Sequence, residues 1–171
     1  MRTHPEYARH PLALVDTRRQ RLYLVKRLHL CGQYPVSTSR YGMGAIKDSY
    51  RTPPGIHKVI AKIGEGEPLY RHFKARCPTD KIAEANPYAT ISGTDAICTR
   101  ILHLGGLEPR INRGGYHDSE QRCIYIHGTV DEKRIGRLSS IGCIRMKNRD
   151  VIEVFNTLQQ NSIVYIMPSK N

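Results

Sequence analysis

Short runs in which apolar and polar residues alternate dominate this chain and predict a mainly β protein. Residues 12–30 hold two apolar segments around a polar turn at residues 16–19, a pattern typical of a β-hairpin. Residues 33–39 continue in extended form. A Pro-Pro-Gly turn at residues 53–55 precedes another alternating run, and residues 96–106 read as a strand rich in β-branched and aliphatic side chains.

One helix has a clear pattern, near the C-terminus. Val151, Phe155 and Leu158 follow the i, i+4, i+7 spacing of a single apolar stripe. Asp150, followed three residues later by Glu153, resembles a capping box and predicts the start of this helix.

Residues 65–86 interrupt the β pattern. Their periodicity is poor and they contain two prolines, so they predict a long excursion with one short helix, which is either a lid over a site or a surface insertion. Residues 162–168 predict a final strand. The length of 171 residues and the 39% of hydrophobic side chains fit one domain spanning residues 1–171.

The charge points to an acidic partner, because 27 basic residues against 15 acidic ones give a net charge of +12. The basic residues are mostly scattered singly and no nucleic-acid-binding motif occurs, so a small poly-anionic substrate is expected and nucleic acid is not. No stretch of about 18 apolar residues and no secretory signal pattern occurs, so we expect no membrane insertion and no export by a signal peptide.

The five cysteines are odd in number, widely spaced and without a C-x-x-C pair, so they predict neither a disulfide framework nor a zinc site. The histidines are isolated from paired carboxylates at ligand spacing. We therefore expect no metal and no cofactor. Free thiols suit a reducing compartment, which favours a cytoplasmic location.

Residues 124–146 carry the candidate chemistry. An apolar strand ends at His127, and a polar loop returns to Ser140, Gly142 and Cys143. A thiol with a pKa near 8.5 becomes nucleophilic when a neighbouring histidine takes its proton. Amide N–H groups around Gly142 and Cys143 would then face a developing oxyanion. Spacing alone leaves open the alternative that Cys143 is an ordinary buried cysteine.

The pattern IHGT, followed by S-x-G-C-I-R-M with Ser140 thirteen positions after His127, resembles the L,D-transpeptidase catalytic-domain family, also called the YkuD type. The segment TPPGIHKV resembles the T-P-x-G turn of that family, and the resemblance extends over residues 12–168. It implies a mainly β, sandwich-like catalytic domain with one or two short helices.

The resemblance implies that Cys143 is the nucleophile and His127 the base. The residues that it assigns to shaping the site are Ser140, Gly142, Gly128 and Thr129. Arg145 is the candidate for binding a substrate carboxylate, with a surface ion pair as the alternative. Tyr116, on the loop that leads to the catalytic strand, is a second candidate for substrate contact. Ile141 stands where the family usually has a second histidine. This difference affects which molecule, water or an amine, accepts the acyl group from the cysteine.

The implied reaction cleaves the bond between meso-diaminopimelate and D-Ala in a peptidoglycan stem tetrapeptide through a thioester. We expect a cytoplasmic L,D-carboxypeptidase that recycles tetrapeptides or muropeptides, with water as acceptor. The alternative is an L,D-transpeptidase that acts in the periplasm by a route not visible in the sequence. A third hypothesis is a basic binding protein with an inactive site. The sequence predicts no oligomeric state.

Overall fold

The computed structural model describes residues 10–83 and 96–168, and these residues are mainly β, as predicted. They contain ten strands, one α-helix and two 3-10 turns. The elements are β1 (Leu12–Asp16), β2 (Arg21–Lys26), β3 (His29–Ser37), β4 (Gly55–Ile63), β5 (Arg71–Lys74), β6 (Cys77–Ile82), β7 (Ile97–Gly106), η1 (Gly115–His117), β8 (Tyr125–Gly128), η2 (Glu132–Arg134), β9 (Ile144–Met146), α1 (Asn148–Thr157) and β10 (Ile163–Met167).

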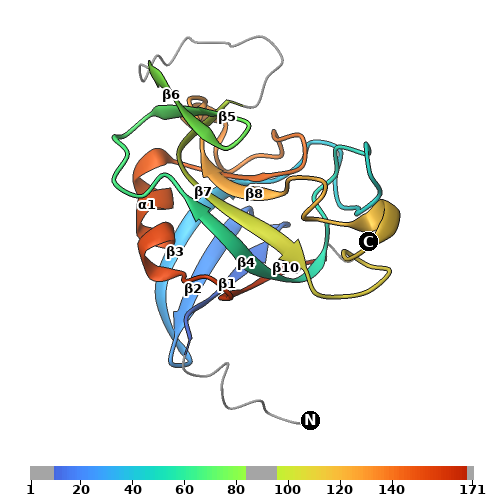
Figure 1. Cartoon of the computed structure of the whole chain (residues 1–171). Helices are drawn as coiled ribbons and strands as arrows, with labels where there is room; N and C mark the ends of the chain where they lie inside the picture. The colour runs from blue at the N-terminus through green and yellow to red at the C-terminus, as the bar shows by residue number, and fades with distance from the viewer. Residues whose placement is uncertain (1–9, 84–95, 169–171) are drawn as a thin grey trace.

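Eight of the strands close on themselves. The sheet order is β4-β10-β1-β2-β3-β9-β8-β7-β5-β6, and an additional pairing joins β4 to β7. Each strand of the circuit therefore has a hydrogen-bonded neighbour on both sides, which removes the open edges at which sheets aggregate. The hairpin β5–β6 lies outside the circuit and is attached through β5 to the start of β7 (Figure 1).

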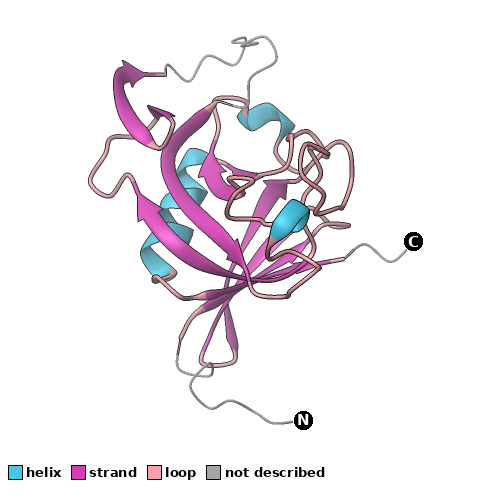
Figure 2. Cartoon of the chain, turned by 45° about the vertical axis from the view of Figure 1, so that its right-hand side comes forward, coloured by secondary structure: helices cyan, strands magenta, loops and turns pink. Residues whose placement is uncertain are grey.

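One hydrophobic core fills the space between the strands and α1. The predicted stripe of the helix is confirmed, since Val151, Phe155 and Leu158 are at most 1% exposed. These side chains belong to the same buried cluster as the inward residues of β1, β2, β7 and β10. Figure 2 shows α1 on one side of the strands and most of the long loops gathered on the other. The site described below is built from those loops.

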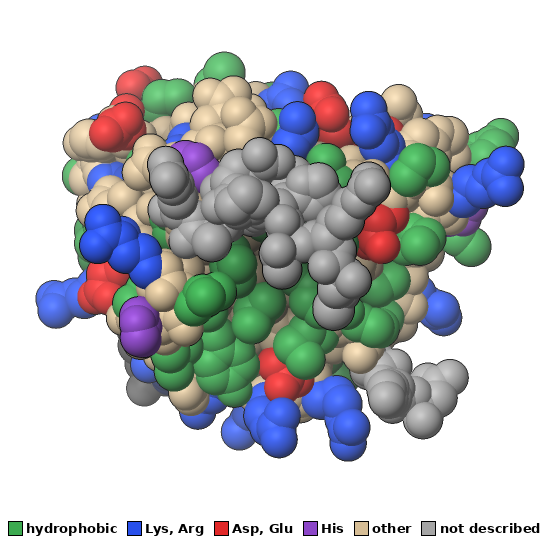
Figure 3. Space-filling view, turned by 90° about the horizontal axis from the view of Figure 1, so that it is seen from below, with side chains coloured by type: hydrophobic (Ala, Val, Ile, Leu, Met, Phe, Trp, Pro, Cys, Tyr) green, Lys and Arg blue, Asp and Glu red, His purple; other side chains and the backbone are tan. Residues whose placement is uncertain are grey.

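The outward positions of the sheet near the N-terminal hairpin are also apolar. Leu14 of β1 lies between Tyr23 of β2 and Tyr165 of β10 in register, and all three side chains are half-buried. Figure 3, which views the molecule from below, shows hydrophobic side chains gathered on this side. The alternation expected of a sheet with one solvated face is therefore weak here.

The predicted capping box is wrong. Helix α1 begins at Asn148, two residues before Asp150. The side chain of its N-cap residue, Lys147, makes no capping hydrogen bond. The Asn148 amide instead donates to Glu132 Oε1 at 2.7 Å. A carboxylate from another turn of the chain therefore satisfies an N–H of the first turn, a role that sequence spacing had assigned to Asp150.

The predicted short helix between residues 65 and 86 is also wrong where the structure describes the segment. Residues up to 83 form the hairpin β5–β6, while residues 84–86 lie outside the described residues. Each strand of this hairpin is only four to six residues long. β6 is largely exposed, so no periodic apolar pattern marks either strand.

His57, which follows the Pro-Pro-Gly turn, ties β4 to the loop of residues 107–122. Its ring is fully buried, with Nδ1 3.0 Å from the Gly55 carbonyl oxygen and Nε2 3.0 Å from Ser119 Oγ. Because a carbonyl oxygen only accepts, Nδ1 donates and Nε2 accepts from the hydroxyl. Burial lowers the pKa of His57 to about 4, so the neutral ring is the folded form.

This buried histidine predicts a loss of stability in acid. Its ordinary pKa of 6.5 applies to the unfolded chain, so between pH 6.5 and about 4 the unfolded state binds the extra proton. The free energy of unfolding should fall by about 3 kcal/mol across that window, with no further contribution from His57 above it. Urea titrations of wild type, His57→Gln and the exposed-site control His29→Gln at pH 7 and pH 4.5 measure this effect. Equal pH dependence in all three proteins contradicts it.

Candidate active site

The parallel pair β8–β9 sets the relative positions of the two predicted catalytic residues. Ile126 is paired with Ile144 and His127 with Arg145. Extending this register by one residue places Cys143 beside Tyr125. Because side chains alternate between the faces of a sheet, His127 and Cys143 lie on one face, and Ile126 and Ile144 point into the main core.

The separation of the two residues follows from strand geometry. Neighbouring strands lie about 4.8 Å apart and two residues along a strand span about 6.6 Å, so the Cα atoms are roughly 8 Å apart. Side chains at this diagonal offset are able to meet. The register thus places His127 and Cys143 on the same face of β8–β9, and their catalytic roles stay a prediction.

The ring of His127 is oriented by its own turn. The side chain is fully buried and its Nδ1 lies 2.8 Å from the Gly128 carbonyl oxygen. The carbonyl only accepts, so in the neutral ring Nδ1 carries the proton and Nε2 is the nitrogen that can accept another. This is the tautomer that a general base needs.

Cys143 is half-exposed at the start of β9 and packs against a small cluster that includes Phe73, Ile101 and Tyr125. Its Sγ lies 3.5 Å from the Cys123 carbonyl oxygen. Cys98 is a useful contrast, since it is buried and burial raises the pKa of its thiol to about 12. The accessible Cys143 thus has the surroundings of a reactive cysteine and Cys98 those of an inert one.

Ser140 organises the turn that presents the thiol. Its Oγ donates to the Cys143 carbonyl at 2.6 Å and accepts from the Gly142 amide at 3.2 Å. The Gly142 N–H is therefore engaged within the turn, and the expected contact of the Gly142 and Cys143 amides with an oxyanion stays a prediction. Gly142 has a φ of +130°, which favours glycine. This backbone conformation explains why position 142 holds a glycine.

Glycine is also required at position 128. A Cβ built on Gly128 would lie 2.7 Å from the Cys98 carbonyl oxygen and closer still to Asn148 Oδ1. Thr129, which is also buried, accepts from the Asp131 amide through its hydroxyl at 3.2 Å. The two residues after His127 therefore fix the turn that holds the histidine ring.

Asn148, which the sequence analysis missed, anchors this turn from the start of α1. Its Nδ2 donates to the Thr129 carbonyl and to Glu132 Oε1, both at 2.7 Å, and its Oδ1 accepts from Thr99 Oγ1 at 2.6 Å. The side chain is fully buried. An asparagine just after the S-x-G-C-I-R-M motif was the available signal, but its partners lie up to 49 residues away.

Replacing Asn148 should test this anchor. In Asn148→Ala the Thr129 carbonyl and the Thr99 hydroxyl lose buried partners, so the free energy of unfolding should fall by about 2–4 kcal/mol. Asn156→Ala, at an exposed position of the same helix, is the matched control and should change it by less than about 0.5 kcal/mol. Chemical denaturation measures both. Similar values for the two variants contradict the anchoring role.

Known proteins are similar to this chain in sequence and in the fold that positions these residues. A family model described as the L,D-transpeptidase catalytic domain (YkuD) matches residues 10–166. The chain belongs to the L,D-transpeptidase catalytic-domain family. A putative L,D-transpeptidase YkuD from Bacillus licheniformis is 46% identical over 43 residues, which are 25% of this chain and 26% of that protein.

Solved structures of L,D-transpeptidases share the fold at low sequence identity. L,D-transpeptidase 3 from Mycobacterium tuberculosis, solved with a faropenem-derived adduct, is 12% identical with a TM-score of 0.57, over 92% of this chain and 60% of that one. An L,D-transpeptidase from Mycobacterium smegmatis is 16% identical with a TM-score of 0.53, over 92% and 58%. The chain thus spans less than two thirds of the length of these relatives.

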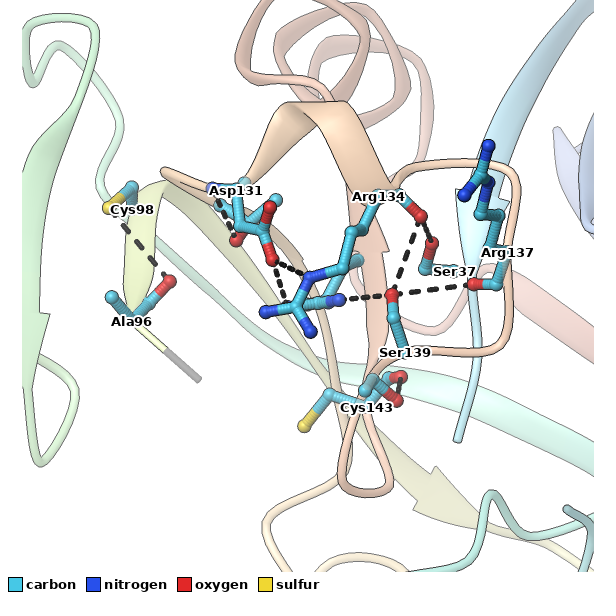
Figure 4. A network of polar contacts seen from close by, with 12 residues as sticks. Ser37, Ala96, Cys98, Asp131, Arg134, Arg137, Ser139 and Cys143 are labelled. Carbon is cyan, nitrogen blue, oxygen red and sulfur yellow. Dashed lines mark hydrogen bonds and ion pairs between the residues drawn. The ribbon is translucent and has the colours of Figure 1, made fainter. Parts of the chain in front are cut away.

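Arg145 lies beside His127 in register but is 3% exposed. Its guanidinium donates to Ser139 Oγ and lies 3.8 Å from Asp131 Oδ2. Figure 4 shows Asp131, Arg134 and Ser139 joined in one polar network, with the Cys143 sulfur pointing away from it. Arg145 therefore holds the loop between the two halves of the L,D-transpeptidase motif, and its predicted contact with substrate stays a prediction.

Tyr116 and Ile141 are the remaining residues to which the sequence pattern drew attention. Tyr116 is 77% exposed on η1, and its carbonyl accepts from the Lys47 amide at 2.7 Å. This bond joins the loop of residues 44–51 to the loop that leads into β8. Ile141, in place of the second histidine of the family motif, is half-exposed next to Ser140. A substrate contact of Tyr116 stays a prediction.

The excursion of residues 65–86 contributes to the surroundings of Cys143. Phe73 of β5 is 3% exposed and belongs to the cluster against which Cys143 packs. Phe73, in the described part of this segment, thus packs beside the thiol.

Residues 10–83 and 96–168 contain no group of three metal-ligating side chains placed to hold an ion. In the same parts of the chain, no helix is long and apolar enough to span a membrane.

Proposed function

We propose that this protein transfers acyl groups through Cys143, cleaving the bond between meso-diaminopimelate and D-Ala in peptidoglycan stem tetrapeptides. The observation that carries the proposal is the placement of Cys143 and His127 on one face of β8–β9, with His127 Nδ1 fixed on the Gly128 carbonyl. This is the arrangement of a nucleophile, a base and a group that orients the base.

The reaction has two stages. His127 Nε2 takes the proton of the Cys143 thiol, and the thiolate attacks the diaminopimelate carbonyl. The tetrahedral intermediate collapses as His127 returns the proton to the amine of D-Ala, which leaves a thioester on Cys143. His127 then takes a proton from water as the water oxygen attacks the thioester carbonyl. The C–S bond breaks, the tripeptide leaves with a free carboxyl group, and His127 returns its proton to the Cys143 thiolate.

We propose water as the main acceptor, which makes the protein an L,D-carboxypeptidase. Water is far more concentrated than any competing amine. Ile141 places an apolar side chain where the family motif usually has a histidine, so one polar group is missing beside the turn that carries Cys143. The net charge of +12 suits free muropeptides or their nucleotide-linked forms, which are anionic.

We also propose a cytoplasmic location and a role in peptidoglycan recycling. Cys31, Cys77, Cys98 and Cys123 all carry free thiols, and three of them are exposed. Exposed thiols persist in a reducing compartment. Immunodetection of the untagged protein in cytoplasmic and periplasmic fractions tests this. Enrichment in the periplasm contradicts it.

The acceptor is tested by incubating the protein with L-Ala-γ-D-Glu-meso-diaminopimelate-D-Ala, with and without D-Met, and following the products by mass spectrometry. The proposal predicts tripeptide as the main product in both reactions. A peptide with L-Ala at its C-terminus is the matched control and should stay intact. Loss of its terminal residue at the same rate contradicts L,D specificity.

The second candidate is an L,D-transpeptidase that joins diaminopimelate residues or exchanges D-amino acids. Its support is that the similar solved structures are named L,D-transpeptidases. In the same incubation it predicts a tetrapeptide that carries D-Met as the main product.

A further inference from the structure

Arg122, in the segment that leads into β8, is held in place by the loop of residues 44–51. Its Nη2 donates to the Arg51 carbonyl at 2.7 Å and its Nη1 to the Gly44 carbonyl at 3.3 Å. The side chain is half-buried. Two hydrogen bonds from one planar guanidinium fix the position of its charge better than a flexible ammonium would.

The backbone that binds Arg122 lies against the turn of the nucleophile. A Cβ built on Gly142 would lie 3.6 Å from the Arg51 carbonyl oxygen, the atom to which Arg122 Nη2 donates. Thr52 Oγ1 donates to the Gly142 carbonyl at 2.9 Å. On the other side, Cys143 Sγ lies 3.5 Å from the carbonyl oxygen of Cys123, the residue after Arg122. The guanidinium is thus bound to a carbonyl that lies against Gly142, and the thiol contacts the residue that follows Arg122.

The electrostatic interaction between Arg122 and Cys143 is consistent with the two side chains lying close together. Burial lowers the pKa of Arg122, while the negative charges of the Cys143 thiolate and the Asp48 carboxylate raise it. Arginine stays protonated at any working pH, so the same attraction favours the thiolate. The titratable or charged groups around Cys143 and its neighbour Tyr125 include Arg122, Cys123, Tyr125, His127, Arg76 from the β5–β6 hairpin and, beyond Arg122, Asp48.

We propose that the Arg122 guanidinium stabilises the thiolate form of Cys143, a role that rests on Cys143 being the nucleophile proposed above. Arg122 carries a permanent positive charge, and its interaction with the Cys143 thiolate is attractive. Tyr125 remains protonated, because burial and the neighbouring Cys123 and Cys143 raise the pKa of its phenol. Arg122 thereby supplies a cation that does not depend on the protonation of His127.

A purely structural role is the competing explanation, since Arg122 also binds two carbonyl groups. Two substitutions separate charge from hydrogen bonding. Arg122→Lys keeps the charge and loses the planar fork, whereas Arg122→Gln keeps an N–H donor and loses the charge. Arg113→Gln removes one charge from an exposed position of the same loop and is the matched control.

The test is the pH dependence of iodoacetamide alkylation of Cys143. Tryptic cleavage after Arg137 and Arg145 gives the peptide LSSIGCIR, whose one cysteine is Cys143, so mass spectrometry separates this thiol from the other four. The measured quantity is the pH at which the alkylation rate of Cys143 is half its maximum. We expect this midpoint to rise by about one pH unit in Arg122→Gln. It should stay close to the wild-type value in Arg122→Lys and Arg113→Gln.

An unchanged midpoint in Arg122→Gln overturns the proposal. Equal rises in Arg122→Gln and Arg122→Lys also overturn it and support the structural role, which thermal melts of both variants would register as lower Tm values. Alkylation needs no peptide substrate. Failure to cleave tetrapeptide therefore counts against the proposed function alone, while the titration still decides the role of Arg122.

Discussion

Replacing Cys143 by alanine is expected to reduce D-Ala release from the tetrapeptide by about 10⁴-fold or more. Without the sulfur no thioester forms, and residual catalysis by the other groups of such sites is small. Liquid chromatography of released D-Ala measures the rate. Cys31→Ala, at an exposed position of β3, is the matched control and should retain wild-type activity.

The same variant separates an enzyme from a binding protein with an inactive site. Cys143 is half-exposed and its removal leaves a small change at the surface, so the circular dichroism spectrum and Tm should stay close to those of the wild type. Undiminished D-Ala release by folded Cys143→Ala contradicts the assignment of the nucleophile. An unchanged biological effect of the inactive variant would favour the binding protein.

Replacing His127 by alanine is expected to lower the rate by about 10²- to 10⁴-fold, which is the usual contribution of a positioned base. The thiol remains, so some turnover should persist, unlike in Cys143→Ala. His29→Ala, on the exposed start of β3, should have no effect on the rate.

The effect of His127→Ala is measured from kcat/KM on the tetrapeptide, with the thermal melt of the variant recorded alongside. His127 is fully buried, so the melt shows whether the loss comes from chemistry or from unfolding. A folded variant with a rate within about threefold of the wild type argues against a base at this position.

Local patterns in the sequence were sufficient for several elements. The polar turn of residues 16–19 predicted the hairpin β1–β2, and the Pro-Pro-Gly turn predicted the start of β4. The stripe of Val151, Phe155 and Leu158 identified the buried side of α1. In each case neighbouring residues carry the signal, because period and turn chemistry act over a few positions.

Features that depend on distant partners were not predicted. The pairing of β4 with β7, which closes the strand circuit, joins residues about 40 positions apart and leaves no local pattern. Helix α1 starts at Asn148 because Glu132 caps it, so the nearby Asp150 was misleading. The hairpin β5–β6 is short and exposed on one strand, which hides its periodicity.

The candidate site shows the same division. The motif singled out His127 and Cys143 from the sequence, and the parallel register of β8–β9 puts them on one face. The charge near the thiol was harder to assign. Arg145 matched the motif but is buried in contact with Ser139, whereas Arg122 matched nothing in the motif and lies beside the Cys143 turn. Only the folded chain distinguishes these two arginines.

The most direct test of the account is to find where the acyl group resides during turnover. The protein is mixed with excess tetrapeptide, quenched in acid within the first turnover and digested with trypsin. The account predicts release of D-Ala together with a tripeptidyl group on Cys143 in the peptide of residues 138–145. Release of D-Ala with that peptide unmodified and the acyl group on another residue would contradict it.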